Sequence, residues 1–101
     1  MNEKIVLFAR LKVKQGTEDE AKRAALAIVD DSRTEPGCLN YDFHQAIDDA
    51  TVFLWHQTWT NQAALDAHFA MPYFAELGAK LKDLTEEPLQ LTLTKMVSEK
   101  A

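Results

Sequence analysis

The stretch Lys4-Ile5-Val6-Leu7-Phe8-Ala9-Arg10-Leu11-Lys12-Val13 decides the fold, because its side chains alternate with the two-residue period of a β-strand. One side of such a strand carries only apolar residues: Ile5, Leu7, Ala9, Leu11 and Val13. The other side carries Val6, Phe8, Arg10 and Lys12, and only half of it is apolar. The stretch therefore predicts a strand that buries one face fully and needs partial cover on the second.

A helix is predicted directly after this strand. The pair Gln15-Gly16 turns the chain, and Thr17 followed by Glu20 has the pattern of a capping box. Small and apolar residues then recur at helical spacing: Ala21, Ala24, Ala25, Ile28 and Ser32. Glu35-Pro36-Gly37 is expected to end the helix, because proline cannot continue its hydrogen bonding.

A hairpin and a second helical region are predicted next. Residues 39–45 and 52–59 have the composition of strands, and the polar segment Asp48-Asp49-Ala50 between them predicts an antiparallel turn. Thr60 is the expected N-cap of the following helix, which Pro72 interrupts and restarts as a first-turn residue. Pro88 is expected to close this region before a last strand over residues 89–94.

The elements follow the order β-α-β-β-α-β of a ferredoxin-like α+β domain. We expect one domain over residues 1–101, with a four-stranded antiparallel sheet and the helices on one face. Apolar residues would also lie on the uncovered face: Val6, Phe8, Val52, Leu54 and Met96. Because so much apolar surface is rarely left in water, we predict a homodimer whose two sheets face each other.

Composition limits the partners of the chain. It has 11 Lys and Arg against 16 Asp and Glu, a net charge of -5, and no basic cluster longer than Lys22-Arg23. Nucleic acids and anionic membranes need a concentrated basic face, so neither is expected as a partner. No apolar run approaches the roughly 20 residues that cross a bilayer. The single cysteine, Cys38, fits a cytoplasmic location and lacks a basic neighbour that would make it a nucleophile.

Three segments resemble the antibiotic biosynthesis monooxygenase family. Glu35-Pro36-Gly37-Cys38-Leu39-Asn40-Tyr41 is similar to its E-P-G-C-x-x-Y segment. Trp59 with residues 64–68, ALDAH, is similar to its W-x-x-x-x-A-L-x-x-H segment, and Met71-Pro72-Tyr73-Phe74 to the start of its next helix. The resemblance implies a dimeric α+β barrel with a pocket between sheet and helices. It also implies oxidation of quinols or polyketide aromatics by molecular oxygen without a cofactor.

Other branches of the family act on small bacterial signal molecules or degrade haem, and the chain departs from the commonest pattern. Gln57 stands where many relatives carry glutamate, and Tyr73 where many carry a second histidine. Ala9 and Gly78 stand where the haem-degrading branch has an asparagine and its axial histidine, so haem is not expected as a ligand.

His68 is the leading candidate for a catalytic group. It shares the apolar side of its helix with Ala64 and Leu65, and a histidine in such a pocket can remove a proton from a phenol or enol. The alternative is a core histidine bonded to a backbone carbonyl. Gln57 and Tyr73 are the expected hydrogen-bond donors to the resulting oxyanion.

An aromatic wall is expected to hold the substrate. Its members are Tyr41, Phe43, Trp55, Trp59 and Phe74. Such a wall suits a flat aromatic ligand, although a small domain also needs aromatic residues simply to fill its core. His44 and His56 fall on the opposite face, near Asp42 or Arg10, and the histidine spacing matches no metal site.

Three functions remain open on the sequence. The first is a cofactor-independent monooxygenase acting with O2 on a quinol or a similar enolisable aromatic. The second is an enzyme that isomerises or degrades a small signal-like hydroxyketone. The third is a non-catalytic dimer that binds a small molecule.

Overall fold

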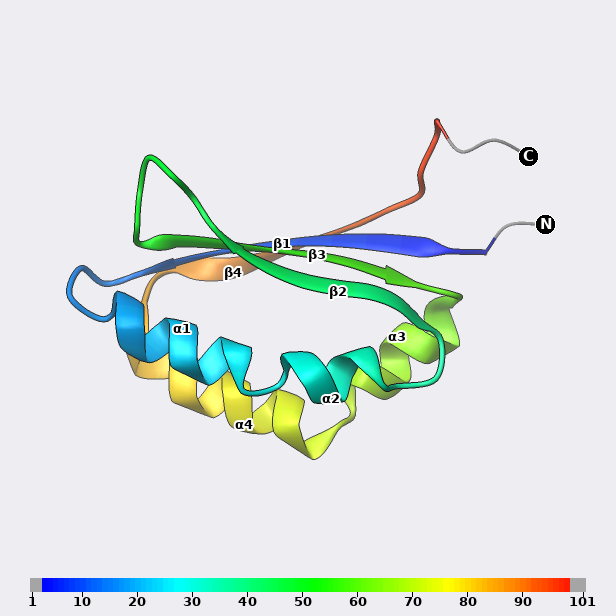
Figure 1. The fold of residues 1–101 in the computed structure, drawn as a ribbon, viewed down its shortest axis with the longest axis horizontal. Helices are drawn as coiled ribbons and strands as arrows, with labels where there is room; N and C mark the ends of the chain where they lie inside the picture. The colour runs from blue at the N-terminus through cyan, green and yellow to red at the C-terminus, as the bar shows by residue number, and fades with distance from the viewer. Residues whose placement is uncertain (1–2, 99–101) are drawn as a thin grey trace.

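The computed structural model describes residues 3–98. The elements are β1 (Ile5–Val13), α1 (Glu18–Leu26), α2 (Val29–Arg33), β2 (Cys38–Gln45), β3 (Val52–Trp59), α3 (Gln62–Phe69), α4 (Pro72–Leu81), the 3-10 turn η1 (Lys82–Leu84) and β4 (Thr85–Thr94). The strands form one antiparallel sheet in the order β2-β3-β1-β4, and the helices cover one of its faces (Figure 1). This confirms the ferredoxin-like α+β fold. Within residues 3–98, no helix is long and apolar enough to span a membrane.

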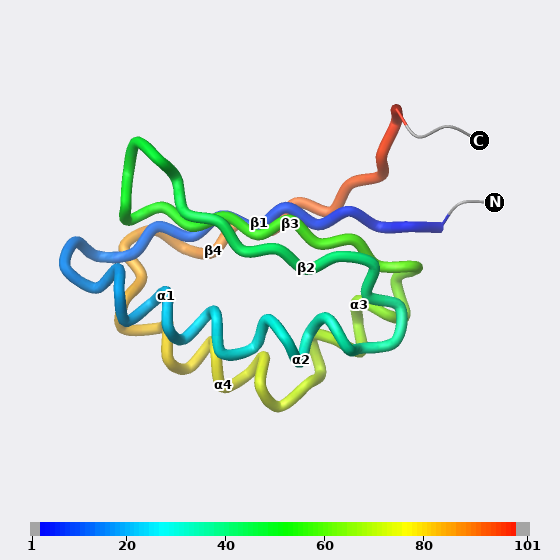
Figure 2. Tube along the Cα trace, viewed as in Figure 1, coloured from blue at the N-terminus to red at the C-terminus, as the bar shows by residue number. Residues whose placement is uncertain are grey.

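The first helical region contains two helices where the sequence predicted one. Residues 27–28 interrupt the helix between α1 and α2, which follow one another along the same side of the sheet (Figure 2), and both Ile28 and Val29 are buried. The predicted capping box is wrong. The Thr17 hydroxyl donates to the Lys14 carbonyl at 2.6 Å, and Glu18 accepts the Gly16 N–H at 2.8 Å. These short-range bonds close the turn before α1 and leave the helix without a side-chain cap.

The N-cap of α3 is Asn61, and the prediction of Thr60 is wrong. The Asn61 Oδ1 accepts the Ala64 N–H at 2.9 Å, whereas the Thr60 N–H donates to the Gly37 carbonyl at 2.9 Å. Thr60 therefore ties the end of β3 to the turn before β2. Pro72 does open α4 at its first turn, as predicted.

Pro88 lies inside β4, so the prediction that it closes the helical region is also wrong. The helix gives way to strand already at Thr85. Because β4 is an edge strand, a residue without an N–H is tolerated there. The pairing of β4 with β1 shifts register between Arg10 and Lys12, opposite this proline.

The core lies between the sheet and the helices. The predicted inner face of β1 is buried from Leu7 to Val13, and it packs with Phe53, Trp55 and Trp59 of β3. The helices contribute buried residues from three elements: Ala21, Ala25, Leu65, Leu77 and Leu81. This packing places the aromatic side chains of β2 and β3 directly under α3 and α4.

The second sheet face is only partly as predicted. Phe8, Leu54 and Met96 are 49%, 38% and 55% exposed, whereas Val6 and Val52 are already buried within one chain. The Phe8 ring stacks on His56 with centroids 5.1 Å apart. Phe8 and Leu54 on the side without helices, and Met96 beyond the end of β4, therefore remain exposed apolar side chains.

Candidate active site

Three polar side chains meet under the sheet: Glu35, His68 and Tyr73, called here the carboxylate cluster. The His68 Nδ1 lies 2.9 Å from the Glu35 Oε2, and the Tyr73 hydroxyl donates to the same oxygen. His68 is fully buried and the Glu35 side chain is 3% exposed. The cluster joins the turn after α2, the end of α3 and the first turn of α4.

Short-range backbone bonds bring these residues together. The Glu35 N–H donates to the Ser32 carbonyl and its own carbonyl accepts the Cys38 N–H, so Glu35 is held in a tight turn. The Met71 N–H donates to the His68 carbonyl at 3.1 Å, so the link between α3 and α4 is a single turn. That turn sets the His68 and Tyr73 side chains toward one carboxylate.

The hydrogen bonds of the carboxylate cluster bear on which nitrogen of the His68 ring carries the proton. The Tyr73 hydroxyl is a donor to the Glu35 Oε2, because burial and the Glu35 carboxylate raise the pKa of Tyr73 and keep its hydroxyl protonated. A carboxylate at Glu35 can only accept, so Nδ1 is the donor of the His68–Glu35 bond when Glu35 carries its charge, and the lone pair of the imidazole is then on Nε2. That Nε2 is buried without a hydrogen-bond partner. The arrangement is that of a base held in one tautomer by a carboxylate.

Aromatic rings surround the imidazole. Ring centroids lie 4.8 Å away for Trp59, 5.5 Å for Tyr41, 5.4 Å for Phe74 and 5.8 Å for Phe69. Such apolar neighbours exclude water from Nε2 and strengthen its electrostatic interactions.

A small cavity lies beside these rings, called here the aromatic cavity. It is lined by Leu7, Ala9, Tyr41, Trp55, Gln57, Phe69, Phe74, Leu89 and Leu91. Its volume of about 30 Å³ suits a water molecule, whereas pockets for drug-sized ligands typically measure about 300 to 1,000 Å³. Tyr41, Phe69 and Phe74 both line the cavity and contact the His68 ring. His68 therefore lies one side-chain layer behind the cavity wall.

The polar side chains at the cavity are fixed by neighbours. The Trp59 Nε1–H donates to the Gln57 Oε1 at 3.0 Å. Burial raises the pKa of Tyr41 to about 12, although the nearby Ser32 hydroxyl and Trp55 indole lower it in part. Tyr41 is therefore a neutral phenol at any physiological pH.

The structure separates the predicted site residues into three groups. His68 and Tyr73 join through Glu35, which the sequence interpretation placed at the end of a helix and in the E-P-G-C-x-x-Y segment but gave no role in the site. Four predicted residues line the aromatic cavity: Gln57, Tyr41, Trp55 and Phe74. Two do not: Trp59 is fully buried behind Gln57, and Phe43 packs between Phe53 and Trp55.

Glu35 is the residue that the sequence reasoning missed. The signal was its place in the E-P-G-C segment, since a carboxylate before a Pro-Gly turn has no helical partner that explains it. Burial of an acidic side chain is rare unless it is paired, and only the fold reveals this burial.

Cysteine and metal chemistry find no support among residues 3–98. Burial and the nearby Glu35 raise the pKa of the Cys38 thiol, which disfavours the reactive thiolate. No group of three histidine, cysteine or acidic side chains in this part of the chain could hold a metal ion.

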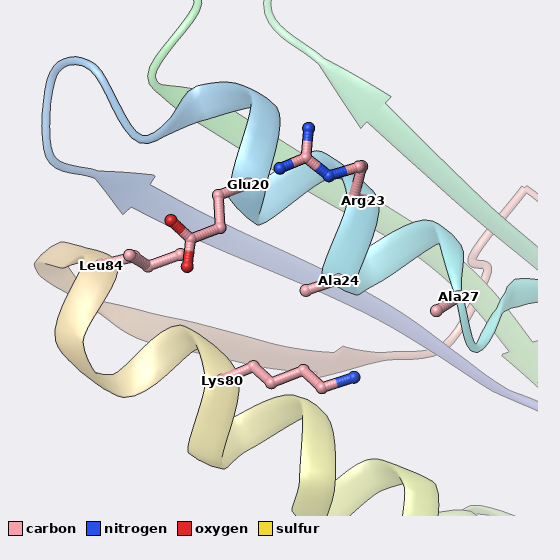
Figure 3. A pocket seen from close by; sticks show the side chains of 6 residues that line it. All are labelled: Glu20, Arg23, Ala24, Ala27, Lys80 and Leu84. Carbon is pink, nitrogen blue, oxygen red and sulfur yellow. The ribbon is translucent and has the colours of Figure 1, made fainter.

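Two hollows on the helical side of the molecule lie apart from the aromatic cavity. One of about 240 Å³ lies between α1 and α4, where Lys80 extends beneath Ala24 and Ala27 (Figure 3). Another of about 350 Å³ borders the outer side of the Glu35–Gly37 turn. The first contains none of the predicted site residues, and the second touches only Glu35 of the carboxylate cluster.

Comparison with known proteins identifies the family of the chain. Residues 4–80 match the family described as antibiotic biosynthesis monooxygenase. The chain is 36% identical over 92 residues to the uncharacterized protein sll1783 of Synechocystis, covering 91% of this chain and 63% of that relative's length. It is 32% identical over 92 residues to the "Putative monooxygenase YcnE" of Bacillus subtilis, covering 91% of this chain and 97% of YcnE.

A solved structure from Nitrosomonas europaea, named as an antibiotic biosynthesis monooxygenase of putative function, superposes with a TM-score of 0.92. That likeness covers 100% of this chain and 97% of the other at 20% identity, and it supports the fold. The family match over residues 4–80 shows that the chain belongs to the antibiotic biosynthesis monooxygenase family.

Proposed function

We propose that the chain is a cofactor-independent monooxygenase that oxidises a quinol or another electron-rich, enolisable aromatic with O2. The observation that carries the proposal is the buried Glu35–His68 pair, with its free Nε2 behind the rings that line the aromatic cavity. Family membership and the naming of YcnE support the same class of reaction.

The proposed reaction begins with removal of a proton. The ring centroids of Phe69 and Phe74 are 5.1 Å apart, and both rings contact the His68 imidazole. A substrate ring inserted between Phe69 and Phe74 would therefore reach the imidazole. His68 Nε2 then accepts the phenol or enol proton, and Glu35 stabilises the imidazolium. General bases of this kind usually contribute about 10²- to 10⁴-fold to a rate.

The anion then reacts with O2. It donates electrons to O2, a C–O bond forms at a ring carbon that carries a hydrogen, and the resulting peroxide anion takes the proton from His68 to become a hydroperoxide. The hydroperoxide then loses water, which includes the hydrogen of that carbon, and leaves a carbonyl. One oxygen atom therefore enters the product and the other leaves as water. Gln57 and Tyr41 would donate hydrogen bonds to the anionic oxygen. Tyr73 is engaged with Glu35, so we assign it to positioning the carboxylate.

The proposal includes a homodimer formed through the patch of Phe8, Leu54 and Met96. All three side chains are exposed, and in β1 and β3 Phe8 and Leu54 alternate with residues that are buried under the helices. Burying them would remove apolar surface from water. The apolar side chains of Leu89 and Leu91 at the cavity mouth are also about half exposed. We place the dimer in the cytoplasm, where a lone thiol such as Cys38 stays reduced.

A second candidate function is a binding protein without catalysis. The observation that favours it is the pair of departures from the commonest family pattern, since Gln57 stands in place of glutamate and Tyr73, in place of a second histidine, is held by Glu35. In this case the carboxylate cluster would stabilise the fold, as a paired buried histidine often does.

Oxygen uptake tests the proposal. Chelator-treated protein is offered anthrone, substituted hydroquinones and an α-hydroxyketone, with protein-free samples to subtract spontaneous oxidation. We expect uptake with at least one phenolic substrate, and its loss in His68→Ala. If no substrate consumes oxygen faster than in the His68→Ala sample, the binding function replaces the monooxygenase. Conversion of the hydroxyketone without oxygen uptake would point to the isomerase or degradation activity.

A further inference from the structure

The Trp59–Gln57 pair fixes which end of the Gln57 amide is available to the aromatic cavity. An indole N–H can only donate, so the Gln57 atom 3.0 Å from the Trp59 Nε1 must be the carbonyl oxygen. The amide NH2 is then the polar group that Gln57 can offer to a ligand. Both side chains are buried, so bulk water does not compete for this bond.

The two other polar residues of the cavity wall can also donate. The Trp55 Nε1–H is buried and makes no hydrogen bond of normal geometry, although it lies near the Tyr41 hydroxyl. The Tyr41 hydroxyl keeps its proton, because burial raises its pKa. The rest of the wall is apolar: Leu7, Ala9, Phe69, Phe74, Leu89 and Leu91.

The wall thus offers the Gln57 amide NH2 and the Tyr41 hydroxyl as donors. Its side-chain oxygens already face donors, because the Gln57 Oε1 accepts from Trp59 and the Tyr41 oxygen lies beside the Ser32 hydroxyl and the Trp55 indole. A ligand oxygen that only accepts can pair with these donors. A ligand whose polar group is an N–H places a donor against the donors of the protein, so these buried groups have no hydrogen-bond partner. Buried polar groups without partners weaken binding strongly.

We infer that the aromatic cavity selects flat ligands by a hydrogen-bond-accepting oxygen, as in an aryl ketone or a phenolate, and that Trp59 determines this specificity by holding the Gln57 amide in its donor orientation. The inference rests on the proposed function for the location of the site. It names the form of the substrate that binds best, which is the anion or keto form and not a hydrogen-bond-donating one. This preference depends on Gln57, because a glutamate at this position would replace the amide donor by an acceptor.

Three bicyclic probes of one size test the inference. 1-Indanone can only accept, indole donates through its N–H, and indene has no polar group. Each is titrated into 15N-labelled protein, and the dissociation constant is read from the side-chain signals of Trp55 and Gln57. We expect 1-indanone to bind about tenfold or more tighter than indole, with the Gln57 side-chain amide signal moving most. Equal or tighter binding of indole would overturn the inference.

Two variants separate donor orientation from shape. Gln57→Glu keeps an oxygen for Trp59 and replaces the cavity donor by an acceptor, so the order of indole and 1-indanone should reverse. Trp59→Phe removes the bond that fixes the amide, so the ratio of the two dissociation constants should fall toward one. An unchanged ratio in either folded variant would contradict the role assigned to that residue. The order in the unmodified protein tests the inference even where a variant fails to fold.

The outcomes distinguish this inference from the proposed function. Preference for 1-indanone without oxygen uptake on any phenol keeps the inference and rejects the monooxygenase. Oxygen uptake without that preference rejects the inference and keeps the monooxygenase. Absence of binding of all three probes at the aromatic cavity overturns the inference.

Discussion

The Nδ1 of His68 and the Oε2 of Glu35 lie 2.9 Å apart, although 33 positions separate the two residues in the chain. The contact joins the turn after α2 to the end of α3, and Tyr73 brings α4 to the same oxygen. A carboxylate placed in this way fixes the tautomer of the imidazole and stabilises its charged form. The catalytic proposal therefore depends on a residue outside the helix that carries the histidine.

Glu35→Gln should abolish most of the activity while preserving the fold. The amide oxygen can still accept from His68 and Tyr73, but the negative charge that stabilises the imidazolium is gone. We expect the oxygen-uptake rate to fall by about 10²-fold or more, and stability to fall by only about 1 to 2 kcal/mol. Uptake kinetics and urea unfolding of the same samples measure both effects.

Tyr73→Phe is the matched control for that variant. It removes one donor to the Glu35 Oε2. The charge of Glu35, the aromatic ring at position 73 and the contact between His68 and Glu35 are retained. A loss of about tenfold or less is expected, with a stability change of about 1 kcal/mol. If Glu35→Gln retains the activity of Tyr73→Phe, the carboxylate has no part in proton transfer.

Alkaline pH should unfold the protein as its tyrosines ionise. The chain has two tyrosines, and both have raised pKa values in the folded state, Tyr41 at about 12. Because the folded state favours the neutral phenols, their contribution to stability is complete below about pH 10, the pKa of an unfolded tyrosine. It is lost as the pH rises from there through about 12.

The near-ultraviolet absorbance of tyrosinate and the circular dichroism signal, followed together against pH, measure this effect. We expect little tyrosinate near pH 10 while the protein is folded, and a rise that coincides with unfolding. In Tyr41→Phe the contribution of Tyr41 is absent, so stability should depend less on pH in this range. A tyrosine that titrates at its ordinary pKa in folded protein would show that its hydroxyl reaches water.

The alternating pattern of β1 predicted the sheet and its buried face, because a two-residue period can be recognised in a short stretch of sequence. The capping residues were harder, since Thr17 and Thr60 have the right chemistry but bond elsewhere. Pro88 in β4 could not be anticipated, because only the strand order shows that β4 is an edge. For the site, alternation along β2 and β3 correctly placed Tyr41, Trp55 and Gln57 under the helices, whereas the Glu35 contact required the tertiary fold.

The patch on the open sheet face predicts the response of the assembly to charge. Leu54→Lys or Phe8→Glu would place a charge where two apolar faces meet, so we expect a dimer to become a monomer at micromolar concentration. Light scattering coupled to gel filtration measures the mass. Leu26→Lys is the control, because Leu26 is 52% exposed on α1, away from this face. A wild-type protein that is monomeric at micromolar concentration would refute the dimer.

The last prediction concerns the turn that positions Glu35. Gly37 has φ +86°, and a Cβ there would lie 2.6 Å from both the Ala64 Cβ and the Thr60 Oγ1. Gly16 has a similar φ of +94° but open space around it. Gly16→Ala should therefore cost only the backbone penalty, about 1 to 2 kcal/mol. Gly37→Ala should cost more, about 3 kcal/mol or more, because the turn must also move away from α3.

The same displacement should reach the carboxylate cluster, because Gly37 is two residues from Glu35 and packs on the helix that carries His68. We therefore expect Gly37→Ala to lower the oxygen-uptake rate even at temperatures where it is fully folded, and Gly16→Ala to leave the rate unchanged. Urea unfolding gives the two stabilities, and the rate is compared under conditions where circular dichroism shows both variants to be native. Equal stabilities would mean that α3 yields to the added methyl group, and an unchanged rate in folded Gly37→Ala would mean that the turn and the base are not mechanically coupled.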